Sequence, residues 1–334
     1  MIWPSSLMAR SYLPVRPRPK CGESLSSWVV RTAHLNGLYL QTFCDLVWPL
    51  YPIWNRDTDR LGDSNILRQM AILTGTSPAK ALATTFPFYE KLLLPETSGS
   101  GLQQEITVLG IFHRLHKKFG QTYCPQCLKE EGYYQLFWRL NCVTVCTKHR
   151  QRLLDRCWNC EAPVCLHRGE IHKCDKCGMD RRDAKTNFHI DSYAFRLQQR
   201  IDQAITTGTI FWDTPSDTPK ALLRLISELM RCCTGQGHRA PELRNTVHKL
   251  MGGDYERLNM PGEKPNIGVL DCETRHQLMA LVGRLIFNWP WSLIACGTNA
   301  KCWRSYFLRP IDDPCHELRE GTALLNYDLN NPVY

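Results

Sequence analysis

Two closely spaced sets of metal-binding side chains constrain this sequence more than any other feature. Each set consists of two pairs, and two residues separate the members of each pair. Zinc takes four thiolate or imidazole ligands in a tetrahedron, and a Cys-x-x-Cys turn presents two of them to one ion. The spacing therefore predicts tandem zinc fingers. The expected ligands are Cys124, Cys127, Cys146 and His149 for the first ion, and Cys157, Cys160, Cys174 and Cys177 for the second.

Disulfide bonding is the alternative use of so many cysteines. The chain has 334 residues and 17 cysteines, which in a chain of this length indicate metal sites and reduced core thiols more than a disulfide framework. The N-terminal MIWPSSLMARS does not fit a signal peptide, and the most apolar stretch, 281–296, is too short to span a membrane. We therefore expect a cytoplasmic protein. Whether Cys165, His167 or His172 replaces a ligand of the second zinc stays open.

Four protein ligands in each set favour a structural role for the metal. A catalytic zinc keeps one position for water and needs a nearby acid or base. The H-x-E that precedes P-C-x-x-C in nucleobase deaminases has no counterpart before Cys124. The sequence also lacks H-E-x-x-H, G-x-S-x-G and Walker A motifs. We expect two structural Zn²⁺ ions per chain and no enzymatic activity.

The positive charge of the chain is concentrated around the cysteine sets. The net charge is +9, and residues 113–185 hold fifteen Lys/Arg against eight Asp/Glu, whereas 1–112 hold ten against eight and 186–334 hold sixteen of each. Seven thiolates and two Zn²⁺ reduce the central surplus to about +4. The remainder can contact phosphate weakly, or it can neutralise the metal sites. The candidate nucleic-acid contacts are Arg16, Arg18, Lys80, Arg150, Arg152 and Arg182.

The N-terminal third predicts an extended basic arm followed by helices. Prolines between 14 and 19 exclude a helix there, and Ser24 is a suitable cap for a helix that ends at 36–37. Apolar spacing over 66–73, Gly75 and a cap at Ser77 then predict a helix-turn-helix. Such a motif can bring a basic side chain to a DNA groove, or it can be a packed hairpin that docks a protein.

The C-terminal third reads as amphipathic helices separated by loops. Helices are expected over 192–206, 219–233 and 273–287, with breaks at 207–218, 234–240 and 252–268. The tail from Asp312 is polar, and we expect it to be loosely ordered. The fold class is therefore mainly α with small zinc-binding modules. The expected domains are an N-terminal helix-turn-helix lobe (1–112), a tandem zinc-finger centre (113–185) and a C-terminal helical lobe (186–334).

Three stretches of the sequence resemble one family. They are LPVRPRPKCGESLSSWVVRTAHLNG near the N-terminus, YCPQCLKEEGYYQLFWRLNCVTVCTKHRQRLLDRCWNC in the centre and, more weakly, GRLIFNWPWSL. The order of Cys-x-x-Cys-Leu, acidic-Gly-Tyr, Trp-Arg, Cys-x-x-His and Leu-x-x-x-Cys is similar to TniQ, the TnsD-like target-selection proteins of Tn7-like transposons. The first ligand set matches this family residue by residue, and the second matches it in kind.

The resemblance implies a non-catalytic protein that marks a target and recruits an AAA+ ATPase, which then recruits the transposase. Short members sit on an RNA-guided CRISPR Cascade complex as a homodimer, and the length of this chain fits that group. We therefore expect an adaptor between a guide complex and the transposition ATPase. The alternative is a TnsD-like selector that reads its DNA sequence without a guide complex. A zinc enzyme acting on nucleic acid is disfavoured.

Overall fold

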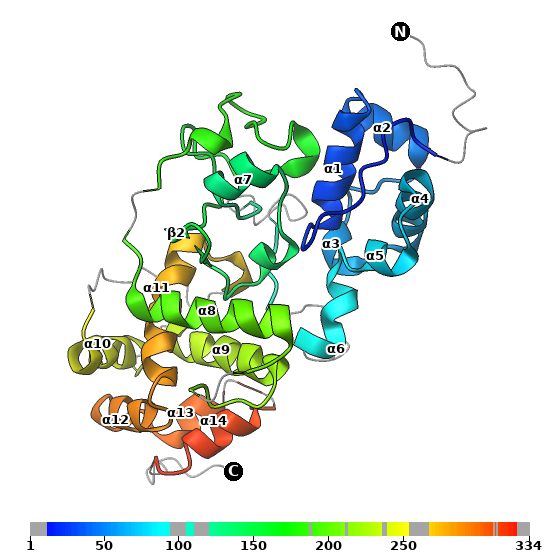
Figure 1. Cartoon of the computed structure of the whole chain (residues 1–334). Helices are drawn as coiled ribbons and strands as arrows, with labels where there is room; N and C mark the ends of the chain where they lie inside the picture. The colour runs from blue at the N-terminus through cyan, green and yellow to red at the C-terminus, as the bar shows by residue number, and fades with distance from the viewer. Residues whose placement is uncertain are drawn as a thin grey trace. The chain divides into compact units, whose positions relative to one another are not determined.

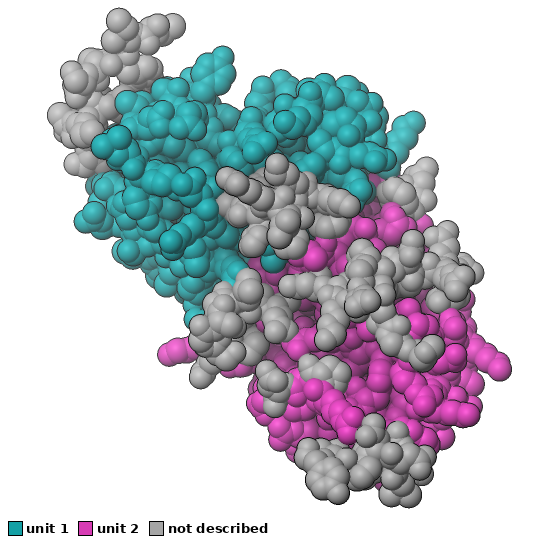
Figure 2. Space-filling model, turned by 180° about the vertical axis from the view of Figure 1, so that it is seen from behind, with its two compact units in different colours: residues 1–90, 108–139, 154–185 teal, residues 91–107, 140–153, 186–334 magenta. Residues whose placement is uncertain are grey.

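The protein is mainly helical with very little sheet, as the sequence predicted (Figure 1). The computed structural model describes residues 12–93, 105–109, 120–186, 189–210, 213–235, 239–253, 267–309, 311 and 313–325. The chain divides into two compact units (Figure 2). Unit 1 comprises 1–90, 108–139 and 154–185, and unit 2 comprises 91–107, 140–153 and 186–334. The division into three domains stays a prediction.

Unit 1 consists of short helices around a core that includes Trp28, Phe43 and Met70. Its α-helices are α1 (Leu25–Leu35), α2 (Leu40–Val47), α3 (Thr58–Leu61), α4 (Ser64–Thr74), α5 (Pro78–Leu82) and α7 (Pro125–Glu131). Its 3₁₀ helices are η2 (Phe86–Tyr89), η4 (Leu136–Arg139), η5 (Leu166–Arg168) and η6 (Arg181–Asp183). The chain passes from unit 1 to unit 2 within α6 (Glu90–Leu93).

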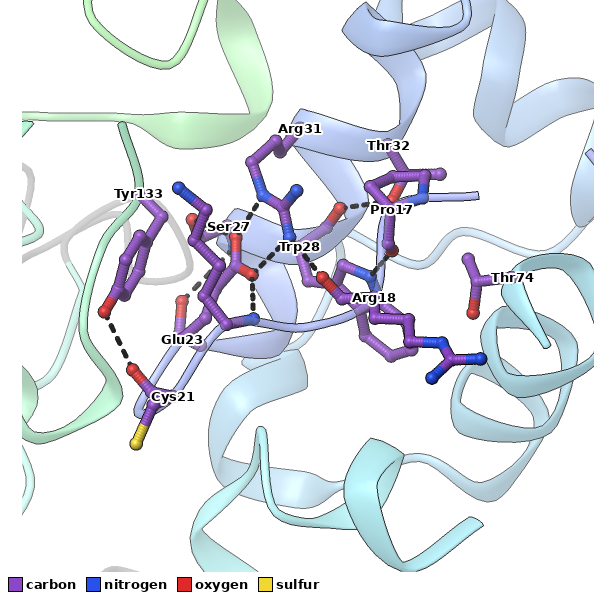
Figure 3. A network of polar contacts seen from close by, with 12 residues as sticks. Pro17, Arg18, Cys21, Glu23, Ser27, Trp28, Arg31, Thr32, Thr74 and Tyr133 are labelled. Atoms are coloured by element: carbon purple, nitrogen blue, oxygen red, sulfur yellow. Dashed lines mark hydrogen bonds and ion pairs between the residues drawn. The ribbon is translucent and has the colours of Figure 1, made fainter. Parts of the chain in front are cut away.

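The arm before α1 is extended, as predicted, and it is bound to that helix (Figure 3). The Trp28 indole donates a hydrogen bond to the Pro17 carbonyl at 2.7 Å, and Arg31 donates to the Arg18 carbonyl at 2.8 Å. Arg31 also forms an ion pair with the buried Glu23 carboxylate at 2.6 Å. The sequence of α1 therefore supplies the partners that an arm rich in proline cannot find within itself.

The helices α4 and α5 form the predicted hairpin. Gly75 ends α4 with a φ of 66°, a left-handed conformation that favours glycine. Ser77 caps α5, and Pro78 occupies its first turn. The second helix has only five residues. Whether this hairpin reads DNA stays a prediction.

Unit 2 is a helical assembly around α11. Its helices are α8 (Ser192–Thr207), α9 (Pro219–Thr234), α10 (Arg239–Met251), η7 (Ile267–Val269), α11 (Cys272–Ile286), α12 (Trp291–Asn299), α13 (Arg304–Leu308) and α14 (His316–Gly321). Helix α11 packs against α8, α9, α10 and α12 and is buried along most of its length (Figure 1). The strands β1 (Val145–Cys146) and β2 (Gln151–Arg152) form an antiparallel hairpin, in which Cys146 lies opposite Gln151.

The three helices predicted in the C-terminal third correspond to α8, α9 and α11. Helix α10 was not predicted, and it begins inside the expected break at 234–240. The expectation of a loose tail was wrong for α14, where Leu318 is fully buried. Within the described residues, no single helix is long and apolar enough to cross a membrane. Helices α11 and α12 reach that length and composition only as a pair, and they are bent by 110°.

Candidate metal centres

The start of α7 positions the first ligand pair. Cys124 is the N-cap residue, and its Sγ accepts a hydrogen bond from the Cys127 N–H at 3.4 Å. Pro125 occupies the first helical position, where a missing N–H is tolerated. Tyr123 precedes the pair and exchanges backbone hydrogen bonds of 2.8 and 2.9 Å with Leu154. Both thiols are buried, with exposed fractions of 0% and 2%.

The hairpin β1–β2 carries the second pair of the same set. Cys146 ends β1, and the chain reverses through a turn in which Arg150 has a φ of 48°. This left-handed residue lets the chain return to β2 within four residues. His149 consequently lies back over the strand, with its Nδ1 3.6 Å from the Cys146 Sγ.

Helices α8 and α11 of unit 2 hold the segment that leads into β1. The buried Arg275 guanidinium donates to backbone carbonyls of 140–143 at 2.9, 3.4 and 3.5 Å. Gln198 accepts the Thr144 N–H at 3.0 Å, and His276 Nδ1 lies 3.2 Å from the Thr144 hydroxyl. Sequence reasoning did not identify these supporting residues. Their signal was the presence of polar side chains on the buried face of helices that otherwise read as apolar.

Burial determines the charge of His276. It lowers the pKa of this histidine to about 4, so the imidazole is neutral near pH 7. The Asp191 N–H lies 3.4 Å from Nε2, which therefore acts as an acceptor, and Nδ1 carries the proton that faces Thr144. A neutral side chain with both nitrogens engaged fixes the segment before Cys146.

The four ligand atoms of the first set form one group. The Sγ atoms of Cys124, Cys127 and Cys146 and a ring nitrogen of His149 all lie within 4.8 Å of one another. Three of the residues are buried, and the histidine is half-buried. Three thiolates and one imidazole are a donor set that suits a tetrahedral ion, and they leave no coordination position for water. The group can therefore hold one metal ion in a closed shell.

The second set is built from two turns within unit 1. In the first turn, Cys157 exchanges backbone hydrogen bonds with Glu161 and Ala162, at 3.0 and 2.8 Å. In the second, the Cys174 N–H donates to the Met179 carbonyl at 2.9 Å. The Trp158 indole joins the turns by donating to the Asp180 carbonyl at 2.9 Å. These local bonds fold the segment into a module that presents four cysteines to one point.

The second group contains only thiols and is more exposed than the first. The Sγ atoms of Cys157, Cys160, Cys174 and Cys177 all lie within 4.8 Å of one another, and two of the four residues are exposed. The Met179 N–H is the main reason that the pKa of Cys177 falls to about 6, and hydrogen bonds from neighbouring thiols also lower it. A thiolate at neutral pH beside three further thiols is a ready metal ligand.

The three residues that could replace a ligand lie outside this group. Cys165 Sγ is 3.3 Å from Nδ1 of His167, and the His167 ring stacks on Trp54 at 5.5 Å. His172 lies 3.6 Å from the Glu170 carboxylate. The structure therefore brings together the four cysteines of the second set and gives these residues other partners.

The candidate nucleic-acid contacts differ in solvent exposure and in their partners. In unit 1, the residues Arg16, Arg18, Lys80 and Arg182 are exposed. Arg150 of unit 2 is also exposed, and its guanidinium lies 5.5 Å from the Phe195 ring centre. Arg152 is buried and forms an ion pair with Glu273 at 3.0 Å. Its guanidinium is therefore poorly placed to contact a phosphate. The contacts themselves stay predictions.

Comparison with protein families identifies the N-terminal part of the chain. Residues 14–153 match the model of the TniQ family, a stretch that contains the arm, the α4–α5 hairpin and the complete first ligand set. The comparison with curated proteins gives no match.

Proposed function

This chain belongs to the TniQ family, and from that premise we propose that it is the target-site adaptor of a transposon. The family role in transposon target-site selection supports this directly. We propose further that the chain links an RNA-guided Cascade complex to an AAA+ transposition regulator, which recruits the transposase. It would act in the bacterial cytoplasm, as a homodimer, and without catalysis of its own.

The closed ligand groups are the observation that carries the non-catalytic part of the proposal. Each group offers four protein ligands, so a bound ion has no position for water or substrate. We propose that the ion is Zn²⁺ in both centres, because thiolate and imidazole donors suit zinc. Zinc would then supply folding free energy to the surfaces that the adaptor presents.

A groove along the helix-turn-helix hairpin supports docking of a protein. It has a volume of about 550 Å³ and is lined mainly by apolar side chains of α4 and α5, among them Leu67, Ala71 and Ile72. Ile72 is 45% exposed. A helix-turn-helix that reads DNA presents polar side chains to base edges, whereas this face favours an apolar partner.

A reconstituted transposition assay tests the adaptor role. Cells carry the transposon ends, the transposase, the ATPase, the guide complex and this protein, and insertions are counted and mapped by sequencing. We expect insertions at the guided site to disappear when either this gene or the guide RNA is omitted. Guided insertion without this protein would contradict the proposal. Light scattering of the purified protein at micromolar concentration checks the predicted homodimer.

The alternative, a selector that reads DNA by itself, is favoured by the exposed basic side chains of unit 1, which include Arg16, Arg18 and Lys80. Footprinting of the isolated protein at physiological salt separates the two functions. The adaptor predicts weak and sequence-tolerant binding, because few phosphates can be neutralised by so small a surplus charge. A discrete protected site with nanomolar affinity would establish the alternative, since base readout adds roughly 4–10 kcal/mol.

A further inference from the structure

Arg181 is a buried cation whose side chain makes no hydrogen bond of normal geometry among the described residues. It begins η6, its side chain is 1% exposed, and it is among the largest fully buried side chains of the described residues. Its Nε, Nη1 and Nη2 atoms have no acceptor at normal hydrogen-bond geometry within the part of the chain that the structure describes. Burying a guanidinium costs several kcal/mol unless an opposite charge compensates it. A compensating charge is therefore expected close by.

The neighbours of Arg181 indicate which groups could compensate the charge of its guanidinium. The groups that interact with it electrostatically include Cys165 and, in decreasing order of effect, Tyr134, Tyr123, Cys174 and Asp175. The Tyr134 hydroxyl is also close enough to act as a weak hydrogen-bond partner. Burial raises the pKa of both tyrosines, so their hydroxyls are neutral at pH 7. Asp175 acts on Arg181 without a direct ion pair among the described residues, and its Oδ1 is itself without a hydrogen-bond partner there. Cys174, a member of the second ligand group, is a further acidic group that acts on Arg181.

The backbone places Arg181 at the base of the turn that carries two of the ligands. Its N–H donates to the His172 carbonyl at 2.7 Å, and Lys173 pairs with Asp180 in an antiparallel bridge. Cys174 and Cys177 lie between these two pairs of residues. The position of the guanidinium is therefore tied to the position of the thiols.

Metal binding would add negative charge at Cys174, one of the groups that act on Arg181. Four thiolates and one divalent cation carry a net charge of −2, whereas four neutral thiols carry none. We propose that Arg181 is the buried counter-charge of the second centre and stabilises its metal-loaded form. The inference rests on the proposed metal binding, and it assigns to this arginine a role in holding the ion, not in contacting nucleic acid.

The adjacent Arg182 provides a natural comparison. Its side chain is exposed and forms a bidentate pair with Asp180, in which Nε donates to Oδ1 at 3.0 Å and Nη2 donates to Oδ2 at 2.6 Å. Its charge is therefore satisfied without the metal. Two consecutive arginines thus have different partners, and the same substitution at both separates a buried counter-charge from general loss of positive charge.

The test uses the full-length, zinc-loaded protein and measures zinc content and the rate of zinc transfer to a chromogenic chelator. For Arg181→Met we expect the zinc of the second centre to be released about 10–100-fold faster, the usual effect of losing a residue that supports a metal site. The zinc of the first centre should be released at the wild-type rate. Arg181→Lys keeps the charge and should stay close to wild type, as should Arg182→Met.

A compensating variant distinguishes charge from packing. Replacing the exposed ligand by Cys160→His lowers the charge of the loaded centre from −2 to −1, so it should partly restore zinc retention to Arg181→Met. Equal zinc loss in the Lys and Met variants, without rescue by Cys160→His, would overturn the counter-charge and leave a packing role. Wild-type release by Arg181→Met would overturn the inference alone. Absence of zinc from the wild-type protein would overturn the metal proposal as well.

Discussion

The two ligand groups have similar spacing in the sequence but different surroundings. In the first group, Cys124, Cys127 and Cys146 are no more than 6% exposed, and eighteen residues separate the two ligand pairs in the sequence. In the second, Cys160 and Cys177 are exposed, and two local turns supply all four thiols.

This difference teaches that one ligand chemistry can serve two structural purposes. A buried ion joins segments that the chain separates, so its binding free energy belongs to the folding of the surrounding core. An ion at the surface closes a local module that already has its own hydrogen bonds. We therefore expect loss of the first ion to affect the whole protein and loss of the second to remain local.

Removal of a first-centre ligand should have the largest effect. In Cys124→Ala we expect the zinc content to fall from two ions per chain to about one and the melting temperature to fall by more than about 10 °C, because a structural metal contributes many kcal/mol. Calorimetry and metal analysis check this. Cys142→Ala is the matched control, since Cys142 is 3% exposed and lies outside the group. It should cost only about 1 kcal/mol. Equal losses of stability in Cys124→Ala and Cys142→Ala would contradict a special role of the first centre in the folding of the core.

The contribution of His276, which holds the segment before Cys146, should give an effect of intermediate size. It should appear as a pH dependence of the free energy of unfolding. The folded pKa of His276 is about 4, below its ordinary 6.5, so the stability that it contributes is present above pH 6.5 and is lost as the pH falls toward 4. Between pH 7.5 and 5 the loss should amount to about 2 kcal/mol.

Denaturant unfolding across this pH range tests the prediction. His276→Gln should remove most of that pH dependence, whereas His316→Gln, at an exposed position in α14, should keep the wild-type profile. Metal release at acid pH affects all three proteins alike and cancels in the comparison. Parallel profiles for wild type and His276→Gln would show that this histidine does not support the hairpin.

Removal of a second-centre ligand should have the smallest effect on overall stability. In Cys177→Ala we expect one zinc to be lost, with a change of about 1 kcal/mol in the free energy of unfolding. Hydrogen exchange should speed up within 157–183 and stay unchanged in unit 2. Cys21→Ala replaces an exposed thiol outside the group and serves as the control. Global unfolding of Cys177→Ala would show that both centres belong to the core.

Local patterns predicted the longer amphipathic helices and those with clear caps. Cap residues and apolar spacing located α1, α4 and α5, and the same spacing located α8, α9 and α11. The helices that were not predicted are α2, α3, α6, α7, α10, α12, α13 and α14. Of these, α10 and α14 have weak signals of their own. Their burial against neighbouring helices makes them helical, with Leu243 and Leu318 fully buried. Tertiary packing thus decided what local propensity left undecided.

The sequence by itself determined which eight side chains gather into two groups, because a two-residue spacing brings both members of a pair to one point on any tight turn. It also carries the similarity to the TniQ family, whose model matches residues 14–153. Only the tertiary structure decided which group is buried, which arginines are available and which are engaged. Arg152 was predicted to contact phosphate but is buried against Glu273. Arg181 was not singled out by the sequence, and the structure buries it to 1% exposure. The physical reason is that the energy of a charge depends on solvent and on partners distant in the chain, which residue spacing does not encode.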